Sequence, residues 1–151
     1  MRLYLVQHGE AKSEAEDPDR PLTDRGAAYV REVANRATAA GLVKVDRIIH
    51  SGKTRARQTA EIWGETLGVT IEEADGLAPN DDPSIWAGRL TGQDRMLVGH
   101  LPHLANLTQL LLGGDANQPE VVFRNGDLVG LEQDGSGRWA LVVVPPGGAP
   151  A

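Results

Sequence analysis

The stretch LYLVQHG, residues 3–9, decides the predicted fold. Its first four residues are apolar and lead straight into a polar turn, which is typical of a buried strand that ends in a loop. Two later stretches repeat this arrangement, because Arg47–His50 leads into a Ser-Gly-Lys-Thr turn and Met96–Val98 leads into Gly99 and His100. Helical patterns separate these strands, and strands that alternate with helices favour a parallel sheet. The sequence therefore predicts an α/β fold.

Cap and stop signals between the strands predict four helices. Thr23 precedes an acidic first turn, so its hydroxyl is expected to cap a helix that stops at Gly41. A hydroxyl of the 51–54 turn is expected to cap the second helix, which Gly68 ends, and Ser84 to cap the third. The predicted helices cover residues 24–40, 55–67, 84–90 and 102–112.

The remaining apolar segments predict further strands. These cover residues 69–71, 121–123, 128–132 and 139–144. A Gly-rich turn at 134–137 joins the last two, so we expect an antiparallel hairpin at one edge of the sheet. The expected architecture is a three-layer α/β/α sandwich. A chain of 151 residues, 40% of them hydrophobic, fits one domain. We place it at 1–144, followed by a flexible Pro/Gly/Ala tail at 145–151.

Composition excludes several classes of function. The chain has no cysteine, so disulfides, thiolate metal sites and a cysteine nucleophile are impossible. Its formal net charge of −6 leaves no basic field for tracking nucleic acid or an anionic membrane. The apolar stretch at the N-terminus spans only residues 3–6, too short for a signal or membrane segment, so we expect a cytoplasmic protein.

Three polar segments that follow strands are expected to meet at one crevice, because ligands of open α/β sheets bind outside the carboxyl ends of the strands. These segments bring His8, Arg55 and His100 together, along with the start of the helix at Arg55. Free N–H groups and the positive dipole end of that helix favour an anion. Arginine holds tetrahedral oxyanions through paired hydrogen bonds, and an unprotonated imidazole can attack phosphorus. The pattern predicts a phosphate site.

Four ordered motifs carry a resemblance to a known family. They are LVQHGEA at 5–11, DRPLTDRG at 19–26, SGKTRARQTA at 51–60 and VGHLP at 98–102. Together they resemble the phosphoglycerate mutase-like histidine phosphatase superfamily, and within it the SixA-type phosphohistidine phosphatases. The resemblance covers roughly residues 3–112.

The resemblance implies a role for each matching residue. His8 would be the nucleophile, Arg55 a ligand of the transferring phosphoryl group, and His100 a second histidine that stabilises charge on its oxygens. The residues that it implies for phosphate or substrate binding are Gln7, Gly9, Arg20 and Gly99.

Two positions depart from the family pattern. Gln7 stands where the family's Arg-His-Gly opening has arginine, so an amide donor replaces a cation and we expect weakened turnover. Pro79 stands where relatives that act on phosphate esters carry a glutamic acid. An alkoxide leaving group needs a proton, whereas imidazole leaves readily because its conjugate acid has a pKa of about 6.5. The missing acid therefore favours cleavage of a P–N bond.

The predicted function is a metal-independent phosphatase without cofactor that removes phosphate from phosphohistidine on a partner protein through phospho-His8. A chain this short has little room for insertions over the pocket, which suits a protein-borne substrate. Two alternatives stay open. A small-molecule phosphomonoesterase would use Asp81 or Asp82 as the acid, although capping of a helix is the favoured role for both. A non-catalytic module that binds phosphate or phosphohistidine is indicated by Gln7.

Several neighbouring residues have a simpler structural interpretation. His50 is expected to be a half-buried structural histidine, and His103 a first-turn helix residue that faces solvent. Gln58 lies three residues after Arg55 and can share its face of the helix, whereas Arg57 should diverge.

Overall fold

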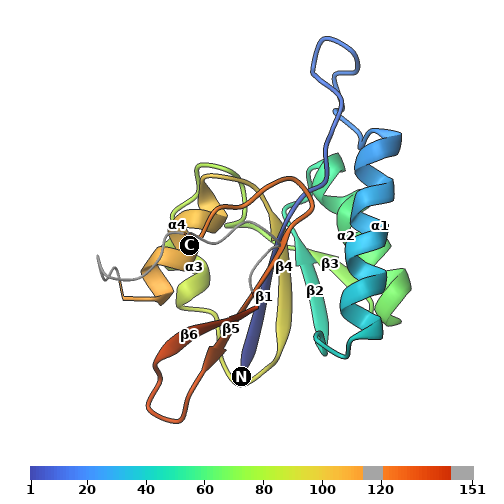
Figure 1. Cartoon of the computed structure of the whole chain (residues 1–151). Coiled ribbons are helices and arrows are strands. Elements are labelled where there is room, and N and C mark those ends of the chain that lie inside the picture. Colours follow the sequence, from blue (N-terminus) through green and yellow to red (C-terminus); the bar gives the residue numbers. More distant parts are fainter. Residues whose placement is uncertain (114–120, 144–151) are drawn as a thin grey trace.

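A computed structural model of the chain describes residues 1–113 and 121–143. Its strands are β1 (Arg2–Gln7), β2 (Arg47–His50), β3 (Ile71–Glu73), β4 (Arg95–Gly99), β5 (Leu128–Gln133) and β6 (Trp139–Val143). They form one sheet in the order β3-β2-β4-β1-β5-β6 (Figure 1). The first four in that order run parallel, while β5 pairs antiparallel with β1 and β6 antiparallel with β5. The predicted mostly parallel sheet with an antiparallel edge is confirmed.

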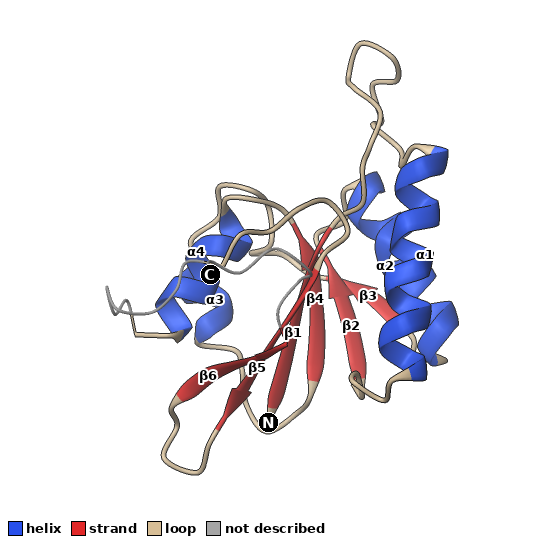
Figure 2. Cartoon of the chain, in the orientation of Figure 1, coloured by secondary structure: helices blue, strands red, loops and turns tan. Residues whose placement is uncertain are grey.

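Helices cover both faces of this sheet. They are α1 (Asp24–Ala39), α2 (Thr54–Leu67), α3 (Pro83–Ala87) and α4 (His103–Leu111). Figure 2 shows α1 and α2 on one side of the sheet and α3 and α4 on the other. Each side has its own apolar core: Trp63 and Val30 pack in the first, and Leu104 and Trp86 in the second. The three-layer sandwich predicted from the sequence is therefore confirmed.

The helix ends confirm some of the predicted caps and correct others. Thr23 accepts a hydrogen bond from the Gly26 N–H, as expected, and Gly68 ends α2 with a left-handed φ of 68°. The expected hydroxyl cap of α2 is wrong, because Lys53 is the N-cap and its side chain makes no capping bond to the described residues. The expected Ser84 cap is also wrong: Asp82 caps α3 by accepting from the Ser84 N–H.

Two strand predictions differ from the structure. The strand expected at 69–71 begins only at Ile71, which pairs with Ile48 of β2. The expected strand at 121–123 is wrong: Val121 and Phe123 are buried in the second core, but the described chain gives that segment no strand pairing. Burial explains the apolar pattern there without any sheet. The expected tail at 145–151 and the end of the last predicted strand at residue 144 lie outside the described residues.

The carboxyl ends of β1, β2 and β4 all open on the same edge of the sheet, since these strands run parallel. The long connection from β1 to α1 projects from that edge in Figure 1. Within residues 1–113 and 121–143, none of the helices has the length and apolar character needed to cross a bilayer.

Candidate active site

Backbone hydrogen bonds fix His8 at the end of β1. Its N–H donates to the Gly99 carbonyl at 3.0 Å, and its own carbonyl accepts from the Gly126 N–H at 3.0 Å. The next residue, Gly9, donates its N–H to Thr59 Oγ1 of α2 at 3.0 Å. A Cβ on Gly9 would lie 2.8 Å from Val30 Cγ2, so only glycine lets the turn pack this closely on α1.

The ring of His8 is held in one tautomer. Its Nδ1 lies 2.7 Å from the Gly9 carbonyl oxygen, which can only accept, so Nδ1 carries the hydrogen and Nε2 keeps a lone pair. Burial lowers the pKa of His8 to about 4, and the charges of Arg55 and Arg20 act in the same direction. His8 is therefore a neutral imidazole near pH 7, the state in which Nε2 is nucleophilic.

His100 lies beside His8 just after the end of β4. The two ring centroids are 5.1 Å apart and the ring planes are tilted by 52°. His100 is 1% exposed, and burial, followed by the nearness of His8, lowers its pKa to about 3. Its Nε2 lies 2.6 Å from Ser51 Oγ, just after β2. The structure thus brings together the two histidines that the sequence placed after different strands.

Two arginines supply positive charge to this crevice. Arg55 lies in the first turn of α2, and its buried Nε has no hydrogen-bond partner in the described chain. Burial and the charge of Arg20 both lower the pKa of Arg55. Arg20 donates its Nε to the Lys12 carbonyl at 3.0 Å, and its charge also lowers the pKa of His8. Cations that repel one another in this way form a site suited to an anion.

The side-chain amide of Gln7 contacts the turn before β5. Its amide nitrogen donates to Asn125 Oδ1 at 2.8 Å, in the turn before β5. Its Oε1 is buried and has no partner within the residues that the structure describes. One of the two N–H groups of the Gln7 side-chain amide is therefore used by Asn125 and not by phosphate.

The other two histidines are not among the residues predicted to bind phosphate, although the charge of His103 acts on His100. His50 is buried, and its Nδ1 accepts from the Gly52 N–H at 3.0 Å, which confirms the structural interpretation. The prediction that His103 faces solvent is wrong, because this residue is 0% exposed. The first turn of α4 faces the sheet, and neither ring nitrogen of His103 has a partner in the described part of the chain.

The side chains next to Arg55 point elsewhere. Arg57 forms an ion pair with Glu61 at 3.0 Å, which confirms that it diverges from Arg55. Gln58 accepts the Leu22 N–H at 2.7 Å and so holds the connection between β1 and α1 against α2.

The two candidate acids are engaged in turns. Asp81 Oδ2 accepts from the Ala78 N–H at 2.9 Å, and Asp82 Oδ1 accepts from the Ser84 N–H at 2.9 Å. The capping interpretation of Asp82 is confirmed, whereas that of Asp81 is wrong, because Asp81 accepts from the turn at Ala78 and not from α3.

Sequence reasoning missed three polar partners: Ser51, Thr59 and Asn125. Thr59 lies four residues after Arg55, a spacing that places both on one helix face, and its Oγ1 donates to the Arg55 carbonyl at 2.8 Å. Ser51 directly follows a strand that ends at the crevice, so its position carried a signal. Asn125 is distant in sequence from Gln7, and no local pattern relates the two.

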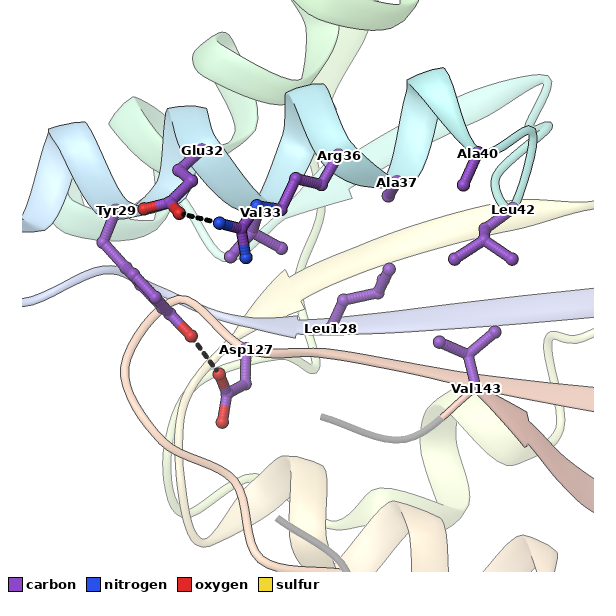
Figure 3. Close-up of a pocket in the computed structure, with 10 residues that line it drawn as sticks. All are labelled: Tyr29, Glu32, Val33, Arg36, Ala37, Ala40, Leu42, Asp127, Leu128 and Val143. Atoms are coloured by element: carbon purple, nitrogen blue, oxygen red, sulfur yellow. Dashed lines mark hydrogen bonds and ion pairs between the residues drawn. The ribbon is translucent and has the colours of Figure 1, made fainter. Parts of the chain in front are cut away.

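A groove of about 310 Å³ lies elsewhere, between α1 and the β5–β6 edge (Figure 3). Its walls are mainly apolar, and Tyr29 at its rim donates its hydroxyl to Asp127 Oδ1 at 2.9 Å. It shares no lining residue with the crevice around His8.

Among the described side chains, no three His, Asp or Glu groups gather closely enough to hold a metal ion.

Residues 3–89 match the model of the histidine phosphatase superfamily, branch 1. The chain belongs to this superfamily. An uncharacterized protein of Picosynechococcus sp. is 33% identical over 141 residues, which cover 87% of this chain and 84% of that protein. Probable phosphoglycerate mutase GpmB of Enterobacter sp. is 38% identical over 76 residues, 47% of this chain; the match spans 34% of that mutase.

Two solved structures of SixA proteins share the fold over nearly their whole length. The protein histidine phosphatase SixA complexed with tungstate has a TM-score of 0.83 and 26% identity, and 95% of each chain is covered. The SixA protein of Agrobacterium tumefaciens, assigned as a phosphohistidine phosphatase, has a TM-score of 0.74 and 28% identity. That match covers 94% of this chain and 95% of the other. The superfamily recognised from the four motifs is therefore confirmed.

Proposed function

We propose that this histidine phosphatase dephosphorylates phosphohistidine on a partner protein through a phospho-His8 intermediate. The observation that carries the proposal is the 2.7 Å contact between His8 Nδ1 and the Gly9 carbonyl, which leaves Nε2 as the free lone pair. Desolvation keeps that imidazole neutral, and the cations of Arg55 and Arg20 lie within electrostatic range of it. A buried neutral nucleophile beside two cations suits attack on a phosphoryl anion.

The reaction has two displacements. In the first, the phosphohistidine of the substrate carries a hydrogen on its other ring nitrogen; His8 Nε2 forms a bond to phosphorus while the P–N bond breaks, and the substrate histidine leaves as neutral imidazole with the electron pair of that bond. In the second, a water oxygen attacks phosphorus, the bond from phosphorus to Nε2 breaks and returns its electron pair to Nε2, and inorganic phosphate leaves with both hydrogens of the water. Arg55, His100 and the free N–H groups at the start of α2 stabilise the charge on the phosphoryl oxygens in both steps.

The leaving group argues for phosphohistidine over an ester. Asp81 and Asp82 each use a carboxylate oxygen to accept a backbone N–H in a turn, and the bonds to Ser84 lower the pKa of Asp82, which disfavours its protonated, acid form. An imidazole needs no such acid, since its conjugate acid has a pKa of about 6.5. The likeness to SixA proteins at 26% and 28% identity points to the same substrate class. Independence from metals and cofactors is part of the proposal.

Transfer of a labelled phosphoryl group tests the intermediate. Protein mixed with ³²P-phosphoramidate and quenched with base should carry acid-labile label on His8, and His8→Ala should carry none. His103→Leu is the matched control, because His103 is a buried histidine to which the proposed reaction assigns no role. Label that persists in His8→Ala would exclude His8 as the nucleophile. Faster hydrolysis of an aryl phosphate than of phosphoramidate would instead favour the phosphomonoesterase.

The arrangement of Gln7 favours one alternative, a module that binds phosphohistidine without turning it over. Its amide donates to Asn125, so Gln7 gives the crevice neither the positive charge nor the several N–H donors that an arginine at this position would supply. This alternative predicts that the protein binds phosphate, that Arg55→Ala abolishes the binding, and that neither labelled His8 nor released phosphate is found.

A further inference from the structure

Ser51 contacts the candidate site, yet the proposed reaction does not use it. Strands β2 and β4 are paired so that His50 lies opposite Val98. Ser51 and His100 therefore leave adjacent strands at the same edge of the sheet. Their side chains meet there, with Ser51 Oγ 2.6 Å from His100 Nε2. This is a short hydrogen bond to a histidine that is 1% exposed.

The state of His100 makes this contact consequential. Burial lowers its pKa to about 3, and the neighbouring His8 and Arg55 act in the same direction. The ring is therefore neutral near pH 7 and carries a single N–H. A neutral imidazole offers a donor at one nitrogen and an acceptor at the other, so its tautomer decides what it presents to a ligand.

The direction of the hydrogen bonds around Ser51 selects one tautomer. The Lys53 backbone N–H can only donate, and it lies 3.4 Å from Ser51 Oγ. Within the described chain, His100 Nε2 is the sole acceptor near the Ser51 hydroxyl, because its other contact, the Lys53 N–H, is a donor; the hydroxyl therefore donates its hydrogen to His100 Nε2. The hydrogen of His100 then sits on Nδ1. That nitrogen is buried and has no partner among the residues that the structure describes, so the described chain supplies no acceptor for its N–H.

We propose that Ser51 is a positioning residue that holds His100 in the tautomer with hydrogen on Nδ1, so that His100 donates this N–H to an oxygen of the transferring phosphoryl group. The inference rests on the proposed function, because it assigns a task to His100 within that reaction. His8 has the same tautomer, but a different ring nitrogen takes part in the reaction. The Nδ1 hydrogen of His8 is engaged by Gly9 and its lone pair reacts, whereas the Nδ1 hydrogen of His100 is the group that acts.

Loss of the Ser51 hydroxyl has a defined chemical consequence. Without a donor at Nε2, His100 also populates the tautomer with hydrogen on Nε2. Its Nδ1 lone pair would then face a negative phosphoryl oxygen and repel it. Since preorganised donors act most strongly where charge develops in the transition state, Ser51→Ala should lower kcat more than it changes KM.

Nitrogen NMR of the histidine rings tests the tautomer without any turnover. In protein with ¹⁵N-labelled imidazoles near pH 7, the ¹⁵N shifts of His100 should show hydrogen on Nδ1, with the signals assigned from His→Leu variants. Ser51→Ala should give averaged shifts of both tautomers, while Ser51→Thr should restore the original pattern. Ser136→Ala is the control, because its hydroxyl donates to Asp134 in the β5–β6 turn, away from Ser51 and His100. Hydrogen on Nε2 in the wild type, or unchanged shifts in Ser51→Ala, would overturn the inference.

Kinetics with phosphoramidate complete the test. We expect Ser51→Ala to lose about tenfold in kcat, and Ser51→Thr and Ser136→Ala to stay near wild type. If the wild type shows the predicted ¹⁵N pattern but forms no phospho-His8, the proposed function fails and the tautomer assignment stands. If phospho-His8 forms while Ser51→Ala keeps full kcat, the function stands and the role of Ser51 is overturned.

Discussion

Gln7 lies one residue before the candidate nucleophile and is 8% exposed. Its amide donates to Asn125, while its buried Oε1 has no partner in the described chain. An acceptor without a partner beside an anion site disfavours the anion, whereas a guanidinium at this position would attract it. We therefore expect the identity of this single residue to set how tightly phosphate is held.

Gln7→Arg should tighten binding of inorganic phosphate or tungstate by about tenfold, since a charge-assisted hydrogen bond replaces a neutral one. Isothermal titration calorimetry measures the change. Gln93→Arg adds the same charge at an exposed position away from the crevice and should leave the affinity unchanged. Equal gains in both variants would mean that net charge alone, and not the position of residue 7, controls affinity.

Single residues were also where prediction from sequence was least complete. His8, Arg55 and His100 could be expected to meet, because each follows a strand of one parallel sheet or begins the helix after it. The strand-end position of Ser51 indicated the crevice but not its contact with His100. The partner Asn125 could not be expected at all, since a hydrogen bond between distant turns leaves no periodic pattern. The burial of His103 could not be predicted either, because the few residues after Pro102 do not define which face of the helix packs against the protein.

At the scale of elements, the start of α1 holds the connection from β1 that carries Arg20. The Thr23 N–H donates to the Glu10 carbonyl at 2.9 Å, and Thr23 also caps the helix. Gly26 lies against this connection so closely that a Cβ there would be 2.2 Å from the Glu10 carbonyl oxygen. The helix and the loop can keep this distance only while residue 26 is glycine.

Gly26→Ala should destabilise the protein by about 2 kcal/mol, because the backbone at Glu10 has to move. It should also weaken phosphate binding, since the displaced loop carries Arg20. Urea unfolding and calorimetry measure the two effects. Gly88→Ala is the matched control, because its Cβ would meet atoms no closer than 3.5 Å. A Gly26→Ala protein as stable as Gly88→Ala would show that the loop yields without cost.

Most elements could be predicted because local signals and the tertiary structure agree. The three apolar runs that end in polar turns form β1, β2 and β4. Thr23 caps the start of α1 and Gly68 ends α2, as expected. The exception at 121–123 has a physical reason. An apolar segment buried under a sheet has the same composition as a strand within it, and only the partner strand distinguishes the two.

At the scale of the whole molecule, histidine titration links stability to pH. The pKa of each of the four histidines lies below its usual value because of burial, with values of about 4 for His8 and about 3 for His100. In the unfolded chain they titrate near 6.5. Between these values the unfolded chain binds more protons, so the free energy of unfolding rises with pH.

Wild-type protein should therefore be less stable at pH 4.5 than at pH 7, as measured by urea unfolding at both values. His103→Leu should narrow the difference, because it removes one buried group that the unfolded chain protonates. His103 suits this test since it is fully buried and the proposed reaction assigns it no role. If the variant keeps the full difference between pH 4.5 and pH 7, His103 does not contribute to the acid sensitivity.

The backbone at Arg20 has a φ of 48°, which a residue with a side chain adopts at a cost of about 1 kcal/mol or more. Glycine would remove that cost but would also remove the cation that acts on His8 and Arg55. Selection for a stable fold and selection for a phosphate site therefore favour different residues at position 20. A screen of variants for thermal tolerance alone would drift toward glycine at this position and would lose the residue proposed to bind phosphate.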